Sequence, residues 1–524
     1  MKIENPILKG FNPDPSILRV NDDYFIATST FEWFPGVQIH QSKDLIHWKL
    51  ITRPLNRISQ LDLAGVPDSC GVWAPCLSYD DGIFYLIYTI VRGYGGGCLI
   101  THNYMVTASD ILGDWSERIF LNSSGFDPSL FHDSDGRKWL VNMSCDYGKG
   151  REWFGGILLQ EYSAVEKKLV GPVRSIFRGT EIGKTEGPHL YKINGYYYLL
   201  TAEGGTGLEH AVTIARSKSI YGPYEVDPQN PILTSQKNPF LPLQKAGHAS
   251  IVDTQGGETY MVHLCGRPLP SRGVCTLGRE TGIQKMDWTD DQWLRLEDGG
   301  NEPFLEAAAP CLPLHEWAKE RAIEGFDSET LNINFQSPRI KLGSDMLSLT
   351  ERPGFLRLYG MESLSSAFCQ SLVARRQQAF CYTASTCMEF EPENFKQMAG
   401  LTCYYNTQNY HYLYVSHDAE LGKHLGIITC DNNISRFPLQ EEVSIEGWIR
   451  CCLKAEVYYD RMRFYYSPDG ETWTGVGPEL DMCILSDEHN VWWGFTGAFV
   501  GVCCQDLSGL KKYADFDYFV YQEM

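Results

Sequence analysis

The sequence lacks any apolar run long enough to span a membrane. It also has fewer basic residues than acidic ones. No stretch of the 524 residues approaches eighteen uninterrupted apolar positions, and none precedes the first prolines of MKIENPILKGFNPDPS. The 45 Lys and Arg face 65 Asp and Glu, which gives a formal net charge of -20. Because nucleic-acid binding depends on concentrated basic side chains, we expect no nucleic-acid or membrane partner. We expect a cytoplasmic protein that acts on an uncharged substrate.

Metal and disulfide motifs are also missing, although cysteine itself is not scarce. The 17 cysteines are an odd number, form no C-x-x-C and include the vicinal pairs Cys451–Cys452 and Cys503–Cys504. A vicinal pair fits no simple disulfide framework, and zinc sites need clustered ligands at short spacing. We therefore expect buried free thiols, as in a reducing cytoplasm.

Three enzyme signatures are absent as well. The chain contains no G-x-S-x-G and no H-E-x-x-H, and Gly179–Thr185 is one residue short of a phosphate-binding loop. These absences give no support to a serine hydrolase, a zinc protease or a P-loop enzyme. Long helical periodicity is nearly absent from the first 300 residues, which favours a β-rich fold.

The first 300 residues contain a repeated unit of a small or acidic residue, Pro, a small residue and an aliphatic residue. Its copies begin at Asp14, Ala74, Asp127, Gly187 and His248, with spacings of 60, 53, 60 and 61 residues; the last has Ala in place of Pro. A turn and an aromatic-rich strand follow each of the first four copies. Five such units predict an all-β fold with a five-bladed β-propeller, and a large β-sandwich is the alternative.

Equivalent positions of propeller blades surround one axis, so the five repeat positions should meet at one mouth. Asp14, Asp127 and Glu186 would then bring three carboxyl groups together, where like charges raise one another's pKa. Inverting glycoside hydrolysis needs a carboxylate that deprotonates water and a carboxylic acid that protonates the leaving oxygen, about 6.5–9.5 Å apart. Asp14, held between two prolines, suits the base, and Glu186 suits the acid. The alternative for each Asp-Pro is a simple turn.

Four segments resemble the motifs of family 43 glycoside hydrolases of the two-domain β-xylosidase type. They are Phe11–Ser16, Trp73–Pro75, Ser124–Ser129 and Thr185–His189. The resemblance covers essentially the whole chain and implies a five-bladed propeller with an attached β-sandwich. It implies that Asp14 is the general base, that Glu186 is the general acid, and that Asp127 tunes the pKa and the orientation of that acid. The implied activity is an exo-acting β-1,4-xylosidase that releases xylose from the non-reducing end of xylooligosaccharides.

The same resemblance assigns substrate contacts. Phe31 and Trp73 resemble the apolar walls of the family's pocket, on which the apolar face of a sugar can rest. Arg279 resembles the arginine that binds substrate hydroxyls, and Thr206 is expected to line the same pocket. The alternatives are ordinary propeller core for Phe31 and a surface ion pair for Arg279.

No cofactor is expected to be required, but His248 is a candidate metal contact. It resembles a histidine that in some family members helps to hold a cation or its water shell, and Ca²⁺ is the candidate ion. The alternative is a hydrogen-bonded core histidine. Enzymes resembling this type are often homodimers or homotetramers, so we expect one of these states.

A second domain begins where the repeat ends. We expect the catalytic propeller in residues 1–305, a linker in 306–325 and a jelly-roll, lectin-like β-sandwich in 326–524 that contributes to the active-site rim. Alternating stretches such as Cys387–Glu391 favour antiparallel strands. Gly494–Gly501 resembles the family's aromatic loop, so Phe495 or Phe499 should close the pocket, and Phe499 is taken as the substrate contact.

Other activities stay open at this level. An α-L-arabinofuranosidase, or an enzyme with both activities, is the alternative within the family because the two sugars can present similar hydroxyl geometry. A carbohydrate-binding propeller without catalysis is the alternative outside the enzymes. The presence of all three acids in their motifs argues against the loss of catalysis.

Overall fold

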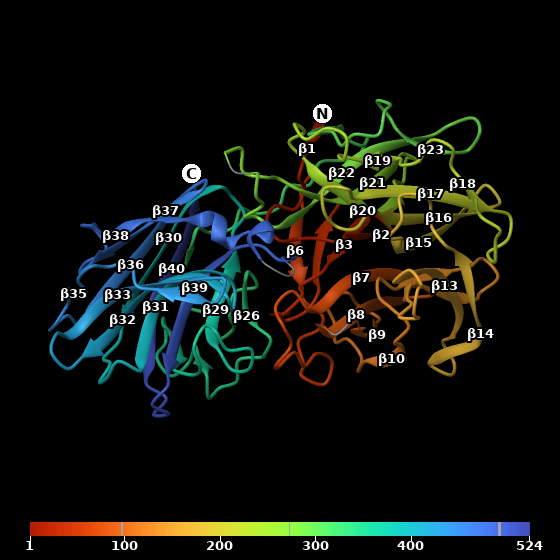
Figure 1. The fold of residues 1–524 in the computed structure, drawn as a ribbon. Coiled ribbons are helices and arrows are strands. Elements are labelled where there is room, and N and C mark those ends of the chain that lie inside the picture. Colours follow the sequence, from red (N-terminus) through yellow and green to blue (C-terminus); the bar gives the residue numbers. More distant parts are fainter. Residues whose placement is uncertain (96–97, 272, 491–493) are drawn as a thin grey trace.

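The computed structural model describes residues 1–95, 98–271, 273–490 and 494–524 and consists of two β-rich bodies side by side (Figure 1). In these residues the only helical elements are two short 3₁₀ turns, η1 (Met482–Leu485) and η2 (Asp487–His489). None of the described helices is long and apolar enough to cross a membrane. The all-β prediction is confirmed.

The N-terminal body is a five-bladed propeller, as the repeat predicts. Blade 1 contains β2 (Ser16–Val20), β3 (Asp23–Thr28), β5 (Gln38–Ser42) and β6 (Lys49–Thr52). Blade 2 contains β7 (Gly71–Asp80), β8 (Ile83–Gly95), β9 (Cys98–Ala108) and β10 (Ile119–Asn122). Blade 3 contains β11 (Ser129–His132), β12 (Lys138–Cys145), β13 (Phe154–Ser163) and β14 (Lys168–Phe177). Blade 4 contains β15 (Glu186–Ile193), β16 (Tyr196–Glu203), β17 (Ala211–Ser217), β18 (Glu225–Val226) and β19 (Leu233–Thr234). Blade 5 contains β20 (Gln244–Asp253), β21 (Thr259–Gly266), β22 (Arg279–Trp288) and β23 (Leu294–Leu296).

The first strand of every blade lies innermost and the five form a closed ring. Contacts run from β2 to β7, β11, β15 and β20, and β20 returns to β2. A small additional sheet pairs β1 (Lys2–Glu4) with β24 (Glu306–Ala308), so the start of the chain lies beside the end of the propeller. Because the repeat positions lie at or next to these inner strands, residues far apart in sequence come together at the centre.

The C-terminal body is a sandwich of two large sheets. One sheet has the order β27-β28-β40-β30-β36-β37-β38, with β25 beside β40. Its strands are β25 (Ile323–Glu324), β27 (Leu347–Ser348), β28 (Leu356–Tyr359), β30 (Cys381–Glu389), β36 (Arg450–Tyr458), β37 (Arg461–Ser467), β38 (Thr474–Asp481) and β40 (Tyr513–Glu523). The other has the order β34-β33-β32-β31-β39-β29-β26-β4, with β35 beside β33. Its strands are β26 (Phe335–Pro338), β29 (Ser371–Arg376), β31 (Gln397–Asn406), β32 (Asn409–Asp418), β33 (Gly422–Asp431), β34 (Ile434–Arg436), β35 (Val443–Ser444) and β39 (Phe499–Asp506).

The last strand of that second sheet comes from the propeller. Strand β4 (Trp33–Phe34) leaves blade 1 and pairs with β26, with Phe34 opposite Ser337 and Trp33 opposite Pro338. The hydrophobic cluster that contains Trp33 of β4 also contains Phe31 of the propeller and Leu372 of the sandwich. A buried ion pair between Arg339 and Asp68, 2.6 Å apart, also crosses the interface. The two bodies therefore share one core at their junction.

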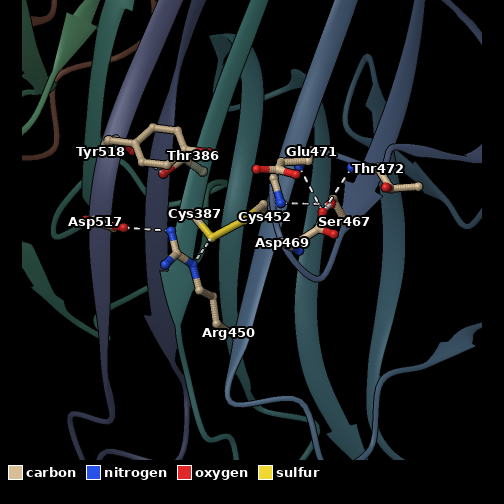
Figure 2. Close-up of a disulfide and its surroundings, with 11 residues drawn as sticks. Thr386, Cys387, Arg450, Cys452, Ser467, Asp469, Glu471, Thr472, Asp517 and Tyr518 are labelled. Atoms are coloured by element: carbon tan, nitrogen blue, oxygen red, sulfur yellow. Dashed lines mark hydrogen bonds and ion pairs between the residues drawn. A yellow bond between two sulfur atoms is a disulfide. The ribbon is translucent and has the colours of Figure 1, made fainter.

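One cysteine prediction is wrong. Cys387 of β30 and Cys452 of β36 form a disulfide (Figure 2), while the other fifteen cysteines are free. The two residues are 65 positions apart in sequence, but strand pairing puts them directly opposite each other. Nε of Arg450 donates to Sγ of Cys387 at 2.8 Å, and Nη2 donates to Asp517 at 2.7 Å. The vicinal neighbour Cys451 stays a buried thiol, so vicinal spacing did not exclude a disulfide.

Candidate active site

A cavity of about 360 Å³ opens at the propeller mouth. Asp14, Asp127 and Glu186 line it together, each from a different blade. All three carboxylic side chains are largely buried, with residue exposures of 6%, 7% and 8%. Three buried acids at one cavity are costly unless protonation or hydrogen bonding compensates them, so the partners of each acid decide what the site can do.

Asp14 is held on both carboxylate oxygens. The hydroxyl of Ser29 donates to Oδ2 at 2.6 Å, and Nη1 of Arg279 donates to Oδ1 at 3.2 Å. The two hydrogen bonds fix the orientation of the carboxyl group, one on each oxygen. This arrangement suits a carboxylate of fixed orientation that accepts a proton.

Glu186 has the opposite electrostatic environment. Burial raises the pKa of its carboxyl group well above the ordinary value, and the nearby charges of Asp127 and Asp14 raise it further. Burial and the charge of Asp14 also raise the pKa of Asp127. The backbone N–H of Gly187 donates to Oδ2 of Asp127 at 3.0 Å and favours the ionised form of that group. We infer that Glu186 keeps its proton near neutral pH and that Asp127 is the neighbour whose charge raises the pKa of Glu186 most.

The backbone at the repeat positions is unusual. Asp14, Asp127, Gly187 and His248 have positive φ angles of 55°, 52°, 56° and 41°. This left-handed region is uncommon for residues other than glycine and concentrates at functional sites. At Gly187 a Cβ atom would also lie 3.0 Å from Nδ1 of His248, so the close packing as well as the positive φ favours glycine beside Glu186.

An aromatic wall covers one side of the cavity. Phe31 and Trp73 both line it, as predicted from the resemblance, and their ring centroids are 6.0 Å apart. The ring of Phe495 lies 5.9 Å from Phe31 and 5.8 Å from Trp73. Phe126 continues the wall at 5.2 Å from Trp73. Such edges and faces offer apolar contact to the C–H face of a sugar ring.

The sandwich contributes Phe495 to the cavity lining, and the prediction that Phe499 contacts the substrate is wrong. Phe499 does not line the cavity: it is fully buried, and its ring is stacked on Trp33 with centroids 3.6 Å apart. Phe499 is the first residue of β39, and its side chain belongs to the shared core, whereas Phe495 precedes the strand. The loop fits against the propeller because Gly278, at φ +71°, leaves room for the carbonyl oxygen of Thr496, 1.7 Å from where a Cβ would lie.

Arg279 joins the base to the aromatic loop. Besides its contact with Asp14, Nη1 donates to the hydroxyl of Thr206 at 2.8 Å, and Nη2 donates to the carbonyl oxygen of Phe495 at 3.0 Å. Arg279 is 3% exposed, so the surface ion-pair alternative is wrong. Its Nε has no partner among the described residues. Arg279 and Thr206 both line the cavity, where they can bind hydroxyl groups.

Sequence reasoning missed several lining residues. His210 lines the cavity, and its Nδ1 contacts the carbonyl oxygen of Lys245 at 3.0 Å, which fixes Nδ1 as the protonated nitrogen. Burial lowers the pKa of His210 to about 3. Its Nε2 has no partner in the described part of the chain and can accept a hydrogen bond from a substrate hydroxyl. The other lining residues missed are Phe126, Trp153, Phe154 and Lys184. Phe126 lies in the family-like segment Ser124–Ser129 and Lys184 directly precedes Thr185–His189, so these two had a signal, whereas Trp153, Phe154 and His210 lie outside every segment that the sequence singled out.

The surroundings of His248 do not fit calcium. Its Nδ1 lies 3.9 Å from Oδ2 of Asp127, and burial, followed by the charge of His248, lowers the pKa values of His189 and His210 to about 3. Calcium needs about six to eight oxygen ligands, and the described contact of His248 supplies one carboxyl group, that of Asp127. No group of three or more His, Cys, Asp or Glu among the described residues is arranged to hold a metal ion.

The cavity combines the oriented carboxyl group of Asp14, the proton-retaining carboxyl group of Glu186 and a hydroxyl-binding guanidinium beside an aromatic wall. Such a set can deprotonate water and protonate the oxygen of a departing group without a cofactor. Glycoside hydrolysis uses two carboxyl groups in different environments, one as a base and one as an acid. Asp14 and Glu186 have such different environments.

Comparison with known proteins identifies relatives of both bodies. The family model described as "Glycosyl hydrolases family 43" matches residues 3–294. The model described as "Beta xylosidase C-terminal Concanavalin A-like domain" matches residues 324–522. The two matches correspond to the propeller and the sandwich.

Full-length relatives are similar along the whole chain. A protein named "Beta-xylosidase" from Bacillus subtilis (strain 168) is 54% identical and covers 100% of both chains. "Xylosidase/arabinosidase 43B" from Humicola insolens is 51% identical over 99% of this chain and 98% of its own. The crystal structure of xylan beta-1,4-xylosidase from Bacillus Halodurans C-125 superposes with a TM-score of 0.98 at 56% identity, covering 99% of this chain and 100% of the other.

Proposed function

Since this chain belongs to glycosyl hydrolase family 43, we propose that it is an exo-acting β-1,4-xylosidase that hydrolyses xylooligosaccharides with inversion. The observation that carries the proposal is the convergence of Asp14, Asp127 and Glu186 from three blades on one cavity with an aromatic wall. The names of the full-length relatives support xylose as the sugar.

The mechanism follows from the two carboxyl environments. Asp14, oriented by Ser29 and Arg279, accepts a proton from water while the water oxygen attacks the anomeric carbon. The bond from that carbon to the bridging oxygen breaks, and Glu186 gives its proton to this oxygen. The raised pKa of Glu186 keeps the proton available near neutrality. One displacement inverts the anomeric centre, so xylose leaves as the α-anomer.

Exo action is supported by the contribution of the sandwich. Phe495 lies against Phe31 and Trp73 at one side of the cavity. A pocket closed on that side accepts a chain end more readily than the middle of a polymer. Short xylooligosaccharides are therefore the proposed substrates.

The stereochemistry provides the first test. We expect ¹H NMR of xylobiose hydrolysis to show α-xylose from the non-reducing residue before mutarotation. The equilibrium mixture from the reducing end is the internal reference. Initial β-xylose, or no hydrolysis of xylobiose, would contradict the proposed reaction.

Removal of the charge of Asp127 should change the pH profile. In Asp127→Asn, the missing negative charge should lower the pKa of Glu186, because a like-charged neighbour raises it. The acid then loses its proton at lower pH. The pH at which kcat/KM falls on the alkaline side should therefore be lower by about one pH unit or more. Steady-state rates between pH 5 and 10 measure this limb. Asp135→Asn, an exposed residue of the same blade, should leave the profile unchanged; an unmoved limb in Asp127→Asn would remove the tuning role.

An α-L-arabinofuranosidase activity is the second candidate. Its support is the relative from Humicola insolens, whose name includes both xylosidase and arabinosidase. Initial rates on the paired nitrophenyl β-xylopyranoside and α-L-arabinofuranoside separate the two activities. A higher kcat/KM on the arabinoside would reverse the order of the candidates.

A further inference from the structure

A second cavity, of about 690 Å³, lies between blade 1, the linking segment and the sandwich, outside the catalytic pocket. Its wall is unusually basic for a chain with a net charge of -20. The cationic side chains that line it are Lys9, Lys49, Arg53, Lys319, Arg375 and Arg376. Only two acidic residues, Glu316 and Glu320, line it among those described, and both are on the exposed linking segment.

Two arginines of this wall are buried without a carboxylate partner. Arg53 and Arg376 are 7% and 6% exposed, and neither forms an ion pair within the described residues. Arg53 donates to the carbonyl oxygen of Ile333 and, at 2.5 Å, to Oε1 of Gln38. Arg376 donates to the carbonyl oxygen of Phe11 at 2.7 Å and to Oε1 of Gln336. All four acceptors are neutral, so the two positive charges are not compensated.

Unpaired nitrogen atoms remain at the same wall. Nε of Arg53, Nη2 of Arg376 and Nδ1 of His40 are buried and have no hydrogen-bond partner among the described residues. Burial and the charges of Arg376 and Arg53 lower the pKa of His40 to about 3, so His40 is neutral. These three nitrogens are enclosed by protein atoms, but other atoms of Arg53, Arg376 and His40 line the cavity, so a ligand there would lie beside both positive charges.

Other buried arginines of this chain are paired. Arg339 contacts Asp68 at 2.6 Å, and Arg279 contacts Asp14 at 3.2 Å. A buried charge without a partner is strongly unfavourable, and the usual remedy is a counter-ion. The contrast within one molecule indicates that the partner of Arg53 and Arg376 is not a side chain.

We propose that this interdomain cavity binds a phosphate-type dianion, either free phosphate or the phosphate group of a small phosphorylated metabolite. Guanidinium groups are preferred partners of phosphate, and the two uncompensated charges match a charge of about minus two. The cavity exceeds the size of a single phosphate, which leaves room for an attached organic group. Lys9, Lys49 and Lys319 offset the two glutamates at the rim.

A bound dianion would connect the two bodies. Arg53 follows β6 of the propeller and Arg376 ends β29 of the sandwich. The guanidinium of Arg376 also lies 5.1 Å from the ring of Phe11 and 5.3 Å from that of Phe499. Phe11 in turn contacts Phe31 of the aromatic wall of the active site, with ring centroids 5.8 Å apart. Binding should therefore stabilise the interface that positions the aromatic wall.

Thermal unfolding of the full-length chain tests the proposal. Inorganic phosphate and glucose 6-phosphate are titrated at constant ionic strength, with NaCl as the balancing salt. We expect a saturable rise in Tm of about 3 °C or more, since a ligand that binds only the native state stabilises it. Non-specific salting effects of phosphate rise without saturation and serve as the contrast. Glucose 6-phosphate saturating at tenfold lower concentration would identify a metabolite as the ligand; equal midpoints would identify free phosphate.

Variants locate the binding. Arg376→Gln and Arg53→Gln should each abolish the saturable shift, whereas Arg137→Gln, an exposed arginine paired with Asp135, should retain it. If either buried variant fails to fold, Lys9→Gln combined with Lys49→Gln at the rim should weaken phosphate binding at least threefold by calorimetry. No saturable response to either probe, or an equal response in Arg376→Gln, would overturn the proposal. Equal affinity in the folded rim variant would also overturn it.

Discussion

Glu186→Gln is expected to lower kcat/KM for xylobiose by about 10²–10⁴-fold, the usual contribution of a general acid. The size of the loss should depend on the leaving group. Xylose leaves poorly without a proton, whereas an acidic phenol leaves well without one. With 2,4-dinitrophenyl β-xyloside, Glu186→Gln should therefore retain most of its activity. Glutamine is close in shape to a protonated glutamic acid, so this buried position should tolerate it.

Asp14→Asn provides the matched comparison. Its loss should be equally large on both substrates, because every reaction needs the base that activates water. Glu181→Gln, an exposed acid shortly before Glu186, is the control and should behave as wild type. Stopped assays on xylobiose and continuous assays on the dinitrophenyl xyloside measure the ratio of kcat/KM in each variant to that of wild type. Equal losses on both substrates in Glu186→Gln would remove the general-acid role, and activity surviving in Asp14→Asn would remove the base.

Trp33→Ala should destabilise the protein by about 3–5 kcal/mol, the usual cost of removing a large buried aromatic side chain. Trp33 is fully buried, stacks on Phe499 of the sandwich and lies edge-on to Tyr404 at 6.0 Å. Its strand also pairs with β26 of the sandwich. We therefore expect both bodies to unfold in one transition that moves to lower urea concentration. Intrinsic fluorescence and far-UV circular dichroism measure the transition together.

Trp33→Phe is the conservative control for this position. The indole Nε1 of Trp33 has no hydrogen-bond partner in the described part of the chain, so phenylalanine keeps ring contact and removes an unsatisfied donor. Its midpoint should stay near that of wild type. Two separate transitions, of which only one shifts in Trp33→Ala, would show that the bodies do not share a core energetically.

The propeller and its acids were predictable because the repeat carries the information locally. Each copy has the same short pattern, and blade equivalence turns a sequence spacing of about 60 residues into proximity around one axis. The converging positions of Asp14, Asp127 and Glu186 follow from that rule, and all three line the cavity. Their chemical roles rest on the resemblance and on the contacts described above.

The remaining features depend on long-range packing, which local patterns do not specify. Phe495 and Phe499 are four residues apart in one glycine-rich segment, and only the start of β39 decides that Phe499 enters the core. Cys387 and Cys452 meet because two strands pair in one register. His210 and Arg376 belong to no motif, and their neighbours come from distant parts of the chain.

The left-handed backbone at four of the five repeat positions has an evolutionary consequence. Asp14, Asp127, Gly187 and His248 share this conformation although their side chains differ in chemistry. If the blades arose by duplication of one ancestral unit, the conformation was inherited as a common feature, and the side chains diversified later. Catalysis then required only side-chain substitutions at positions that already lay near the propeller axis. It did not require a new loop. Directed evolution of other hydrolytic specificities on this scaffold should therefore begin with these inherited positions and the residues next to them.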